Sequence, residues 1–246
     1  MTESKLSEAY RLGQRIRRAF GQGIKEFGLI EPGDKVLVGV SGGKDSLALL
    51  ELLGERVRCT NGSFAIEALH VRMRGVDYQS DTSYLSSFAA QWGVRLHVRE
   101  ASFEADRNAR RSPCFLCSWN RRKVLFETAQ ELGCGKIALG HHQDDILRTA
   151  LMNLTFEGSM ATMPVLLRMR KFPITLIRPF CRVPETDLRR WAELRRYEPQ
   201  VKVCPYDRES NRTAIGEVFA AMERLNPEAR YSLWHALQRE GKLVEL

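Results

Sequence analysis

The 246-residue sequence lacks the features that mark membrane, secreted and repeat proteins. It contains no apolar run of about 18 residues, the length that would predict a membrane span. Its first residues have no apolar segment of the signal-peptide type. Internal repeats and low-complexity segments are also absent. We therefore expect a globular cytoplasmic protein without a membrane partner.

The cysteines lack the second ligand pair of a structural zinc ribbon. The six cysteines are Cys59, Cys114, Cys117, Cys134, Cys181 and Cys204, and in the cytoplasm we expect no disulfides among them. Cys114 and Cys117 form a Cys-x-x-Cys half-site, which suits zinc, a redox dithiol or part of an iron–sulfur cluster. We interpret Cys59, Cys134 and Cys181 as core or incidental thiols.

Cys204 is the nearest candidate for a third ligand. It stands in Cys204-Pro-Tyr-Asp207, where a carboxylate occupies the position of a second cysteine. Three soft ligands with a weak or open fourth position suit an iron–sulfur cluster with one exchangeable iron, which could hold a sulfide. A helix N-terminus and the Arg121-Arg122 pair would favour the thiolate form of the Cys-x-x-Cys pair.

The G-x-x-x-x-G-K-[ST] pattern of the common P-loop is also missing. In its place, an apolar run at 36–40 leads into Ser41-Gly-Gly-Lys-Asp-Ser46 and then into an apolar helical pattern. The run predicts a strand buried on both faces. Gly42 and Gly43 allow a sharp turn that brings backbone N–H groups and the positive helix end against an anion, and Lys44 adds a charge. The segment predicts a phosphate site.

A second polar motif, Gly140-His-His-Gln-Asp-Asp145, follows a predicted strand and opens a predicted helix. Asp144 and Asp145 carry hard oxygen ligands suited to Mg²⁺, and His141 and His142 can donate to phosphate or ribose. The same residue types also suit a transition-metal site or a plain helix N-cap. Because ligands bind beyond the carboxyl ends of strands in open α/β sheets, we expect this loop to meet residues 41–46.

Strand and helix patterns alternate along the chain. Strands are predicted at 36–40, 64–71, 94–98, 136–140 and 174–179, and helices at 5–29, from 46, near 80–92, at 117–133, at 144–154 and at 185–196. This alternation predicts an α/β fold with a doubly wound, mostly parallel sheet, preceded by an amphipathic N-terminal helix and followed by a basic helical C-terminal part.

The formal net charge of +8 favours a polyanionic partner. Basic residues crowd the first predicted helix, and the segment 168–202 holds ten basic residues against four acidic ones. An RNA backbone lying across this face would explain the charges, and so would ordinary solvation of helix surfaces. The sequence leaves both explanations open.

The hexapeptide at 41–46 resembles the signature of the PP-loop family, whose members split ATP between its α- and β-phosphates. Gly140-His-His-x-Asp-Asp resembles the second fingerprint of the RNA-modifying members. Pro113-Cys-x-x-Cys with Arg121-Arg122, Met163-Pro and Ile177-Arg-Pro extend the likeness over about residues 12–210. In this order the motifs resemble the TtcA-type branch, the tRNA 2-thiocytidine (cytidine-32) sulfurtransferases.

The resemblance implies an adenine-nucleotide α-hydrolase-like fold and the ATP-dependent replacement of the C2 oxygen of an anticodon-loop cytidine by sulfur. ATP would contact Ser41, Gly42, Gly43, Lys44, Asp45, Ser46, His70, Gly140 and His141. Lys44, Asp45 and Asp145 would be catalytic, and Asp144 and Asp145 would hold Mg²⁺. A [4Fe–4S] cluster, or alternatively Zn²⁺, would be bound by Cys114, Cys117 and Cys204, with Asp207 as a candidate fourth ligand.

The resemblance also implies partners and a division of the chain. The partners are tRNA and a sulfur donor such as a cysteine desulfurase or free sulfide, and a homodimer is left open. The division consists of an N-terminal helical lead-in at 1–30, a PP-loop nucleotide-binding domain with the iron–sulfur site at 31–215 and a C-terminal helical tail at 216–246.

Two residues depart from the family pattern. Asp207 stands where a cysteine is usual and could ligate the open iron, and Arg148 replaces a glutamate, which reverses a charge near the site. Three alternatives therefore stay open: a lysidine-type tRNA ligase or another PP-loop ATP pyrophosphatase with structural zinc, a thiolase acting on a small molecule, and a non-catalytic zinc- and RNA-binding protein. The intact hexapeptide argues against the last.

Overall fold

The computed structural model describes residues 3–74, 78–79, 81–102, 113–198, 201–202 and 211–246, with residues 3–6, 78–79, 113 and 201–202 described by their backbone alone. The main element is a seven-stranded sheet in the order β4-β2-β1-β5-β7-β6-β9. Its strands are β1 (Lys35–Gly39), β2 (Ala65–Met73), β4 (Leu96–Ala101), β5 (Lys136–Ala138), β6 (Leu166–Arg168), β7 (Thr175–Ile177) and β9 (Val244–Glu245).

Five neighbouring strands, from β4 to β7, run parallel, whereas β6 is antiparallel to β7 and β9 is parallel to β6. Val38 of β1 is opposite Ala68 on one side and Ala138 on the other. The chain builds outward from β1 to β2 and β4 and then returns to β5. The strand order therefore reverses between β1 and β5, and the carboxyl ends of these two strands form the crevice where such sheets bind ligands.

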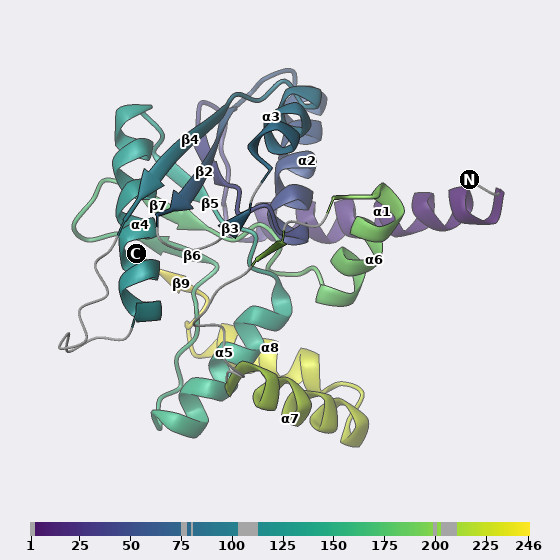
Figure 1. Cartoon of the computed structure of the whole chain (residues 1–246). Coiled ribbons are helices and arrows are strands. Elements are labelled where there is room, and N and C mark those ends of the chain that lie inside the picture. The colour runs from purple at the N-terminus through teal and green to yellow at the C-terminus, as the bar shows by residue number, and fades with distance from the viewer. Residues whose placement is uncertain (1–2, 75–77, 80, 103–112, 199–200, 203–210) are drawn as a thin grey trace.

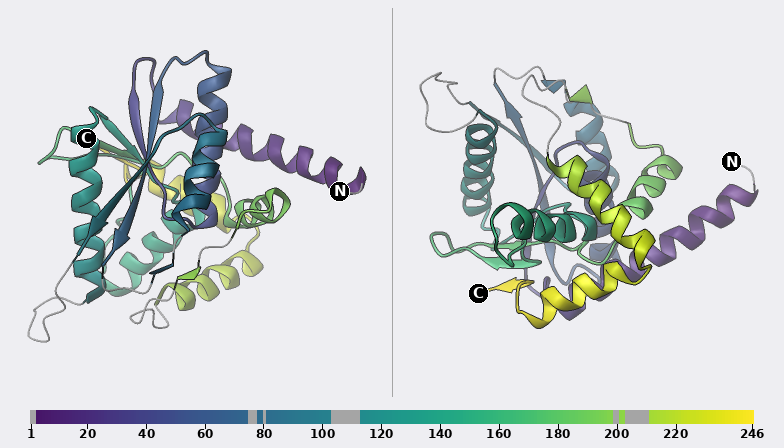
Figure 2. Two further views of the ribbon diagram at one scale, coloured as in Figure 1. Left: turned by 45° about the horizontal axis from the view of Figure 1, so that its top comes forward. Right: turned by 90° about the horizontal axis from the view of Figure 1, so that it is seen from below.

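Helices cover both faces of the sheet, as Figures 1 and 2 show. They are α1 (Glu3–Glu26), α2 (Lys44–Cys59), α3 (Thr82–Gln91), α4 (Pro113–Glu131), α5 (Gln143–Phe156), α6 (Glu185–Arg195), α7 (Asn211–Leu225) and α8 (Ala229–Arg239). Alternate strand residues enter two cores: Val36 and Val38 pack in the large core with α1 and α2, and Leu37 packs in the smaller core under α4. The doubly wound, mostly parallel α/β fold is confirmed.

Several helices begin earlier than their sequence patterns indicate. α2 begins at Lys44, so the last three residues of the hexapeptide form its first turn. α4 begins at Pro113, which suits the first turn of a helix because its missing N–H group has no partner there. The Cys-x-x-Cys pair thus lies inside a helix.

Four short strands were not predicted from the sequence. β6, β9 and the separate two-stranded pair of β3 (Tyr78–Gln79) and β8 (Val201–Lys202) have two or three residues each. Such lengths are too short for an alternating pattern, and each of these strands pairs with a segment distant in the chain, β6 with the nearby β7 as well.

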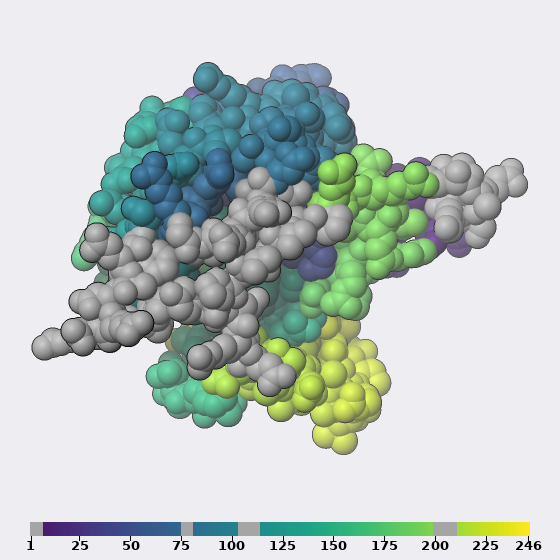
Figure 3. Space-filling view, in the orientation of Figure 1, coloured from purple at the N-terminus to yellow at the C-terminus, as the bar shows by residue number. Residues whose placement is uncertain are grey.

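The large core runs through all three predicted parts of the chain. It includes Ile16 and Phe20 of α1, Phe219 of α7 and Trp234 of α8. α7 also crosses the boundary predicted at 215, and the division of the chain stays a prediction. The helical group of α5, α7 and α8 lies below the sheet, while the first half of α1 projects from the molecule (Figures 1 and 3). Among the described helices, none combines the length and the apolar character that crossing a bilayer requires.

Candidate active site

The loop at 41–46 follows β1 directly and is closed by its own hydroxyl groups. The Ser41 amide donates to the Ser46 hydroxyl (3.1 Å), which donates to the Gly43 carbonyl (2.8 Å). Gly42 has a φ of +82°, which glycine adopts without steric cost. Because α2 begins at Lys44, its positive end and its first N–H groups lie at this loop. The loop has the geometry that an anion site needs.

The loop at 140–145 packs directly against the first loop. A Cβ atom on Gly140 would lie 3.1 Å from the carbonyl carbon of Asp45 and from the amide nitrogen of Ser46, a tight contact with backbone atoms, so the close approach favours glycine. His142 caps α5: its Nδ1 accepts from the Asp145 amide, and the Asp145 carboxylate accepts from the His142 amide. The expectation that the two loops meet at the carboxyl edge of the sheet is confirmed.

Lys44 is held by two carboxylates. Its ammonium group lies 3.0 Å from Asp45 Oδ2 and 3.5 Å from Oε1 of Glu185, the first residue of α6. The second oxygen of Asp45, Oδ1, is buried and has no hydrogen-bond partner among the described residues. A phosphate in the loop would compete with both carboxylates for Lys44, and a metal ion could use the open Asp45 oxygen.

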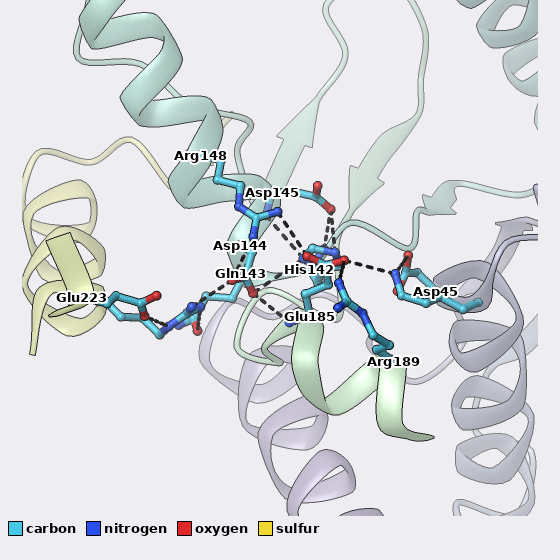
Figure 4. A network of polar contacts seen from close by, with 11 residues as sticks. Asp45, His142, Gln143, Asp144, Asp145, Arg148, Glu185, Arg189 and Glu223 are labelled. Atoms are coloured by element: carbon cyan, nitrogen blue, oxygen red, sulfur yellow. Dashed lines mark hydrogen bonds and ion pairs between the residues drawn. The ribbon is translucent and has the colours of Figure 1, made fainter. Parts of the chain in front are cut away.

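The two aspartates at the start of α5 differ in their surroundings (Figure 4). Asp144 is buried; its Oδ1 accepts from Arg230 and its Oδ2 from the Glu185 amide, both at 2.8 Å. Burial alone would raise the pKa of Asp144, but these hydrogen bonds outweigh it and the pKa is lowered. The side chain of Asp145 is 28% exposed. Asp145 therefore has more room for Mg²⁺ than Asp144, whose oxygens both bond to the protein.

No ready-made metal site is present in the part of the chain that the structure describes, because no three His, Cys, Asp or Glu side chains cluster there. The carboxylates of Asp45 and Asp145 suit Mg²⁺ in their chemistry. They would need phosphate oxygens or water to complete its coordination, which is the usual arrangement when Mg²⁺ binds with a nucleotide.

Arg148, the residue that departs from the family pattern, is paired with acidic side chains. Its Nη1 lies 3.1 Å from Glu185 Oε2, and its Nη2 lies 3.9 Å from Asp144 Oδ1. Glu185 also accepts from Arg189 (3.0 Å), and its pKa is lowered because the pairing with Arg189 and Lys44 outweighs burial. The reversed charge at 148 is therefore balanced locally by Glu185.

A cavity of about 540 Å³ opens beside the first loop, on the α4 side of the sheet. Apolar residues of β2, β7 and α4 form its walls, and Ser41, His70 and His141 lie at its polar end. Its described lining contains four arginines and no acidic residue; the arginines are Arg121, Arg122, Arg178 and Arg212. The size falls in the range of ligand pockets, and the charge suits an anion. A second hollow, of about 430 Å³, lies between α1 and α2 beside Trp92 and includes no residue of either loop.

Arg178 and His141 give this cavity its electrostatic character. Arg178, just after β7, is 7% exposed; one of its terminal nitrogens donates to the Pro164 carbonyl, and its Nε has no partner among the described residues. Burial lowers its pKa to about 10, so it stays charged at neutral pH. Burial and then the charge of Arg178 lower the pKa of His141 to about 4, so this imidazole is neutral.

His70 supports the base of the first loop. It lies in β2 and is 1% exposed, and its Nδ1 donates to the carbonyl of Val40, the residue before the loop, at 2.7 Å. Burial lowers the pKa of the ring, so it is neutral near pH 7. His70 thus fixes the strand end as well as lining the cavity.

Cys114 and Cys117 lie in the first turns of α4, next to the cavity. Residues three positions apart are neighbours on a helix surface, so one metal group can reach both sulfur atoms. Ser118 and Arg121 of the same helix line the cavity. Cys204 and Asp207 lie outside the described residues. The described donors thus fit part of an iron–sulfur or zinc site.

Much of the positive charge on α1 and α6 is used to join helices. Arg15 pairs with Asp187 (2.6 Å), Arg190 with Glu8 (2.7 Å) and Arg17 with Glu55 (2.7 Å). These pairs connect α1 to α6 and to α2. The arginines that line a cavity without described acidic residues are Arg121 and Arg122 of α4, Arg178 just after β7 and Arg212 of α7, so part of the basic surplus is available to an anion there.

Sequence reasoning missed three residues of this site. Glu185 follows Pro184 at an ordinary helix start, and Arg212 stands near the end of the predicted nucleotide-binding part outside any motif, so neither carried a signal. Arg178 did carry one, because it stands directly after a buried strand in Ile177-Arg-Pro. In a parallel sheet that position lies at the ligand edge.

These features define a nucleotide-binding α/β protein whose phosphate loop and second polar loop meet at the switch point of a parallel sheet. The PP-loop domain profile matches residues 12–235. The tRNA-cytidine(32) 2-sulfurtransferase of Neisseria meningitidis serogroup C is 34% identical over 94% of this chain and 73% of its own length. The Paracidovorax citrulli protein of the same name is 35% identical over 94% of this chain and 76% of its own length.

A solved structure agrees with these relatives. The U34-tRNA thiolase NcsA from Methanococcus maripaludis, with its [4Fe-4S] cluster, superimposes with a TM-score of 0.80 and 25% identity over 96% of this chain and 82% of its own. The chain belongs to the PP-loop family and, within it, to the family of the tRNA-cytidine(32) 2-sulfurtransferases.

Proposed function

We propose that this protein uses ATP to replace the C2 oxygen of cytidine 32 in the tRNA anticodon loop with sulfur. The observation that carries the proposal is the phosphate loop at 41–46, packed against the second loop beside an arginine-lined cavity. The family relatives supply the base, since their names specify cytidine 32, whereas NcsA is named for U34.

The chemistry needs activation because the C2 oxygen of a pyrimidine is a poor leaving group. That oxygen would attack the α-phosphorus of ATP, so that the bond to the β-phosphate breaks and pyrophosphate leaves. A sulfur nucleophile would then add at C2, and the oxygen would depart with AMP. The amides of residues 42–46 and the positive end of α2 would hold the pyrophosphate, with Lys44 released from Asp45 and Glu185 to neutralise its charge.

Arg178 and His141 would act at the α-phosphate or the base. Both lie in the cavity, and each has a buried polar nitrogen with no partner among the described residues. A fixed cation and a neutral imidazole can stabilise the charge that develops on the α-phosphate without reorganising. Arg121, Arg122 and Arg212 would neutralise further phosphates at the cavity mouth.

Two bound groups would complete the site. Mg²⁺ would bind Asp45 and Asp145, with Asp144 as a weaker candidate, and would neutralise phosphate oxygens. A [4Fe–4S] cluster would bind Cys114, Cys117 and Cys204 and would supply an iron at which sulfur can be held. The sulfur donor, a cysteine desulfurase or free sulfide, the homodimer and the cytoplasmic location expected for a tRNA-modifying enzyme stay predictions.

Nucleoside analysis tests the function. The chain is produced in a bacterial strain whose tRNA lacks 2-thiocytidine, and digested tRNA is examined by mass spectrometry. We expect 2-thiocytidine at position 32, and none with the variant Lys44→Ala. The protein is also purified without oxygen, and its iron, sulfide and zinc are counted.

Other results of the nucleoside and metal analysis would point to other functions. Thiouridine would point to U34, the base named for NcsA. A lysine-modified cytidine made by an iron-free protein would point to a lysidine-type ligase with structural zinc. Unchanged tRNA from an ATP-hydrolysing protein would point to a small-molecule thiolase. Each of these results would overturn the proposal.

A further inference from the structure

One side of α4 carries a row of large side chains that leads from the cavity to the protein surface. Phe115, Trp119, Arg122 and Phe126 are separated by four, three and four residues, which aligns them on a helix of about 3.6 residues per turn. Phe126 is 7% exposed and, with Arg122, lines the cavity. Trp119 and Phe115 are 50% and 39% exposed. We call these four residues the α4 row.

The exposure of Trp119 is unusual in this protein. Trp191 and Trp234 are 4% and 2% exposed, and Trp92 is half-buried against α2. Leaving a large aromatic side chain in water forgoes the free energy that its burial would provide. Exposed aromatic surface that continues a ligand cavity is typical of a binding surface.

The charge around the row specifies the kind of ligand. Residues 113–123 contain three basic residues and no acidic one. Lys123 pairs with Glu127 one turn further along the helix (3.8 Å), whereas Arg121 and Arg122 have no acidic partner among the described residues. The guanidinium of Arg122 bonds back to the Ser118 carbonyl of its own helix (3.3 Å). An aromatic face beside unneutralised cations is the arrangement by which proteins bind single-stranded nucleic acid, because bases stack and phosphates pair.

We propose that the α4 row, centred on Trp119, is a stacking platform for an unpaired RNA base next to the nucleotide that enters the cavity. The platform rests on the proposed function and names the contact that would hold the anticodon loop. Arg122 would pair with the phosphate between the stacked base and the base in the cavity. α4 covers the face of the sheet opposite to α1 and α2 (Figures 1 and 2).

Binding measurements on the holoenzyme test the platform. The probes are the anticodon stem-loop of a substrate tRNA and a fully paired hairpin of the same length. We expect Trp119→Ala to weaken stem-loop binding about tenfold or more, since stacking contributes roughly 1–3 kcal/mol per base. Binding of the paired hairpin should not change, and Trp119→Phe should restore most of the lost affinity. Tyr231→Ala, which removes a 58% exposed aromatic side chain from α8, is the matched control and should bind as the wild type does.

The salt dependence of RNA binding distinguishes the stacking contact of Trp119 from the ionic contact of Arg122. Arg122→Gln should lower the slope of log Kd against log salt by about one, because one phosphate contact is lost. Trp119→Ala should leave that slope unchanged. Affinity for ATP and the thermal midpoint should match the wild type in Trp119→Ala, which shows that the fold and the nucleotide site are intact.

The outcomes distinguish the two proposals. If the wild type binds the stem-loop and thiolates it, and Trp119→Ala does both equally well, the platform is wrong and the function stands. If Trp119→Ala changes the sedimentation of the protein but not its RNA affinity, the row is an interface between copies of the chain, and the platform is again wrong. If the wild type neither prefers the stem-loop nor thiolates it, both proposals fail.

Discussion

Arg178 combines burial with incomplete neutralisation. A guanidinium that leaves water loses solvation energy, and among the described residues a single hydrogen bond, to the Pro164 carbonyl, returns part of it. The charge of Asp145 raises the pKa of Arg178, but this effect is smaller than the lowering by burial. A bound anion would stabilise this buried and incompletely neutralised guanidinium. We therefore interpret Arg178 as a phosphate-contacting residue of the proposed reaction.

Replacing Arg178 with methionine should impair the reaction far more than the fold. We expect kcat/KM for ATP to fall about 100-fold, because a preorganised cation at the developing charge is lost. The free energy of unfolding should change by less than about 1 kcal/mol, since apolar side chains often replace buried charges without loss. Pyrophosphate release and urea denaturation measure the two effects. Arg168→Met, at an exposed position on β6, is the control, and an equal effect from it would rule out a specific role for Arg178.

The cysteines differ in reactivity because they differ in burial. Burial raises the pKa of Cys181 to about 12 and also raises that of Cys134, so few thiolates form there. Cys59 and Cys114 are exposed, and Cys117 is half-buried. The buried pair confirms the interpretation of these two residues as core thiols.

Alkylation followed by peptide mass spectrometry should reproduce this order in the native protein. In the metal-free protein we expect Cys59, Cys114 and Cys117 to react with iodoacetamide and Cys134 and Cys181 to stay unmodified. Reconstitution with iron and sulfide should protect Cys114 and Cys117 but not Cys59, which serves as an internal control. Labelling of Cys114 and Cys117 that is unaffected by reconstitution would contradict their role as cluster ligands.

At the scale of elements, Asp144 ties three helices together. It lies in the first turn of α5, accepts from the amide that begins α6 and pairs with Arg230 of α8. Arg230 in turn pairs with Glu223 of α7 (2.9 Å) and lies over the ring of Phe219. The network fixes the second polar loop relative to the helical group below the sheet. Its role in the site is therefore to position that loop.

Arg230→Met should destabilise the protein by about 3 kcal/mol at neutral pH, because the buried Asp144 charge loses its partner. The folded-state pKa of Asp144 is lowered, so its contribution to stability is full above the unfolded value of about 3.9 and is lost as pH falls through the folded value. The difference from the wild type should therefore shrink below about pH 4. Urea denaturation across this pH range measures it. Arg224→Met, an exposed change on α7, should leave stability unaltered, and a pH-independent loss in Arg230→Met would contradict the account.

For the whole molecule, the C-terminal helices belong to the same core as the N-terminal helix. The ring of Trp234 on α8 lies 6.2 Å from that of Phe27, which follows α1, and Arg182 lies over it at 5.5 Å. Leu237 and Leu243 enter the same core, and β9 then adds a strand to the sheet edge. The tail therefore stabilises the nucleotide-binding part, although its sequence carries no nucleotide motif.

Trp234→Ala should cost about 3–5 kcal/mol of unfolding free energy, the range for deleting a large buried aromatic side chain. Tyr231→Ala, one turn away on the exposed side of α8, should change it by less than about 0.5 kcal/mol. Thermal and urea denaturation of the two variants give the comparison. Equal stability of the two would mean that α8 packs only loosely and is not part of the core.

Much of the fold follows from local pattern. The apolar residues at 36–40, followed by two glycines and a helical pattern, allow few structures other than a buried strand, a tight turn and a helix. The five parallel strands could be predicted from the sequence for the same reason. β3, β6, β8 and β9 were not predicted, because each has only two or three residues and pairs with a segment distant in the chain, so no periodic pattern marks it. The early start of α4 was also missed, although Pro113 is a favourable first residue of a helix.

The sequence by itself determined the phosphate loop, the second polar loop and the Cys-x-x-Cys pair, since each depends on residue types at short, fixed spacings. Only the tertiary structure decided how their charges are used. Asp144 looks equivalent to Asp145 in the sequence, but it is buried and bonded to Arg230. The arginines of α1 and α6 look like a nucleic-acid surface, but many of them join helices, while Arg178 and Arg212, far apart in the chain, line one cavity. The physical reason is that a charge acts through its neighbours and its exposure to water, and folding rather than spacing brings these neighbours together.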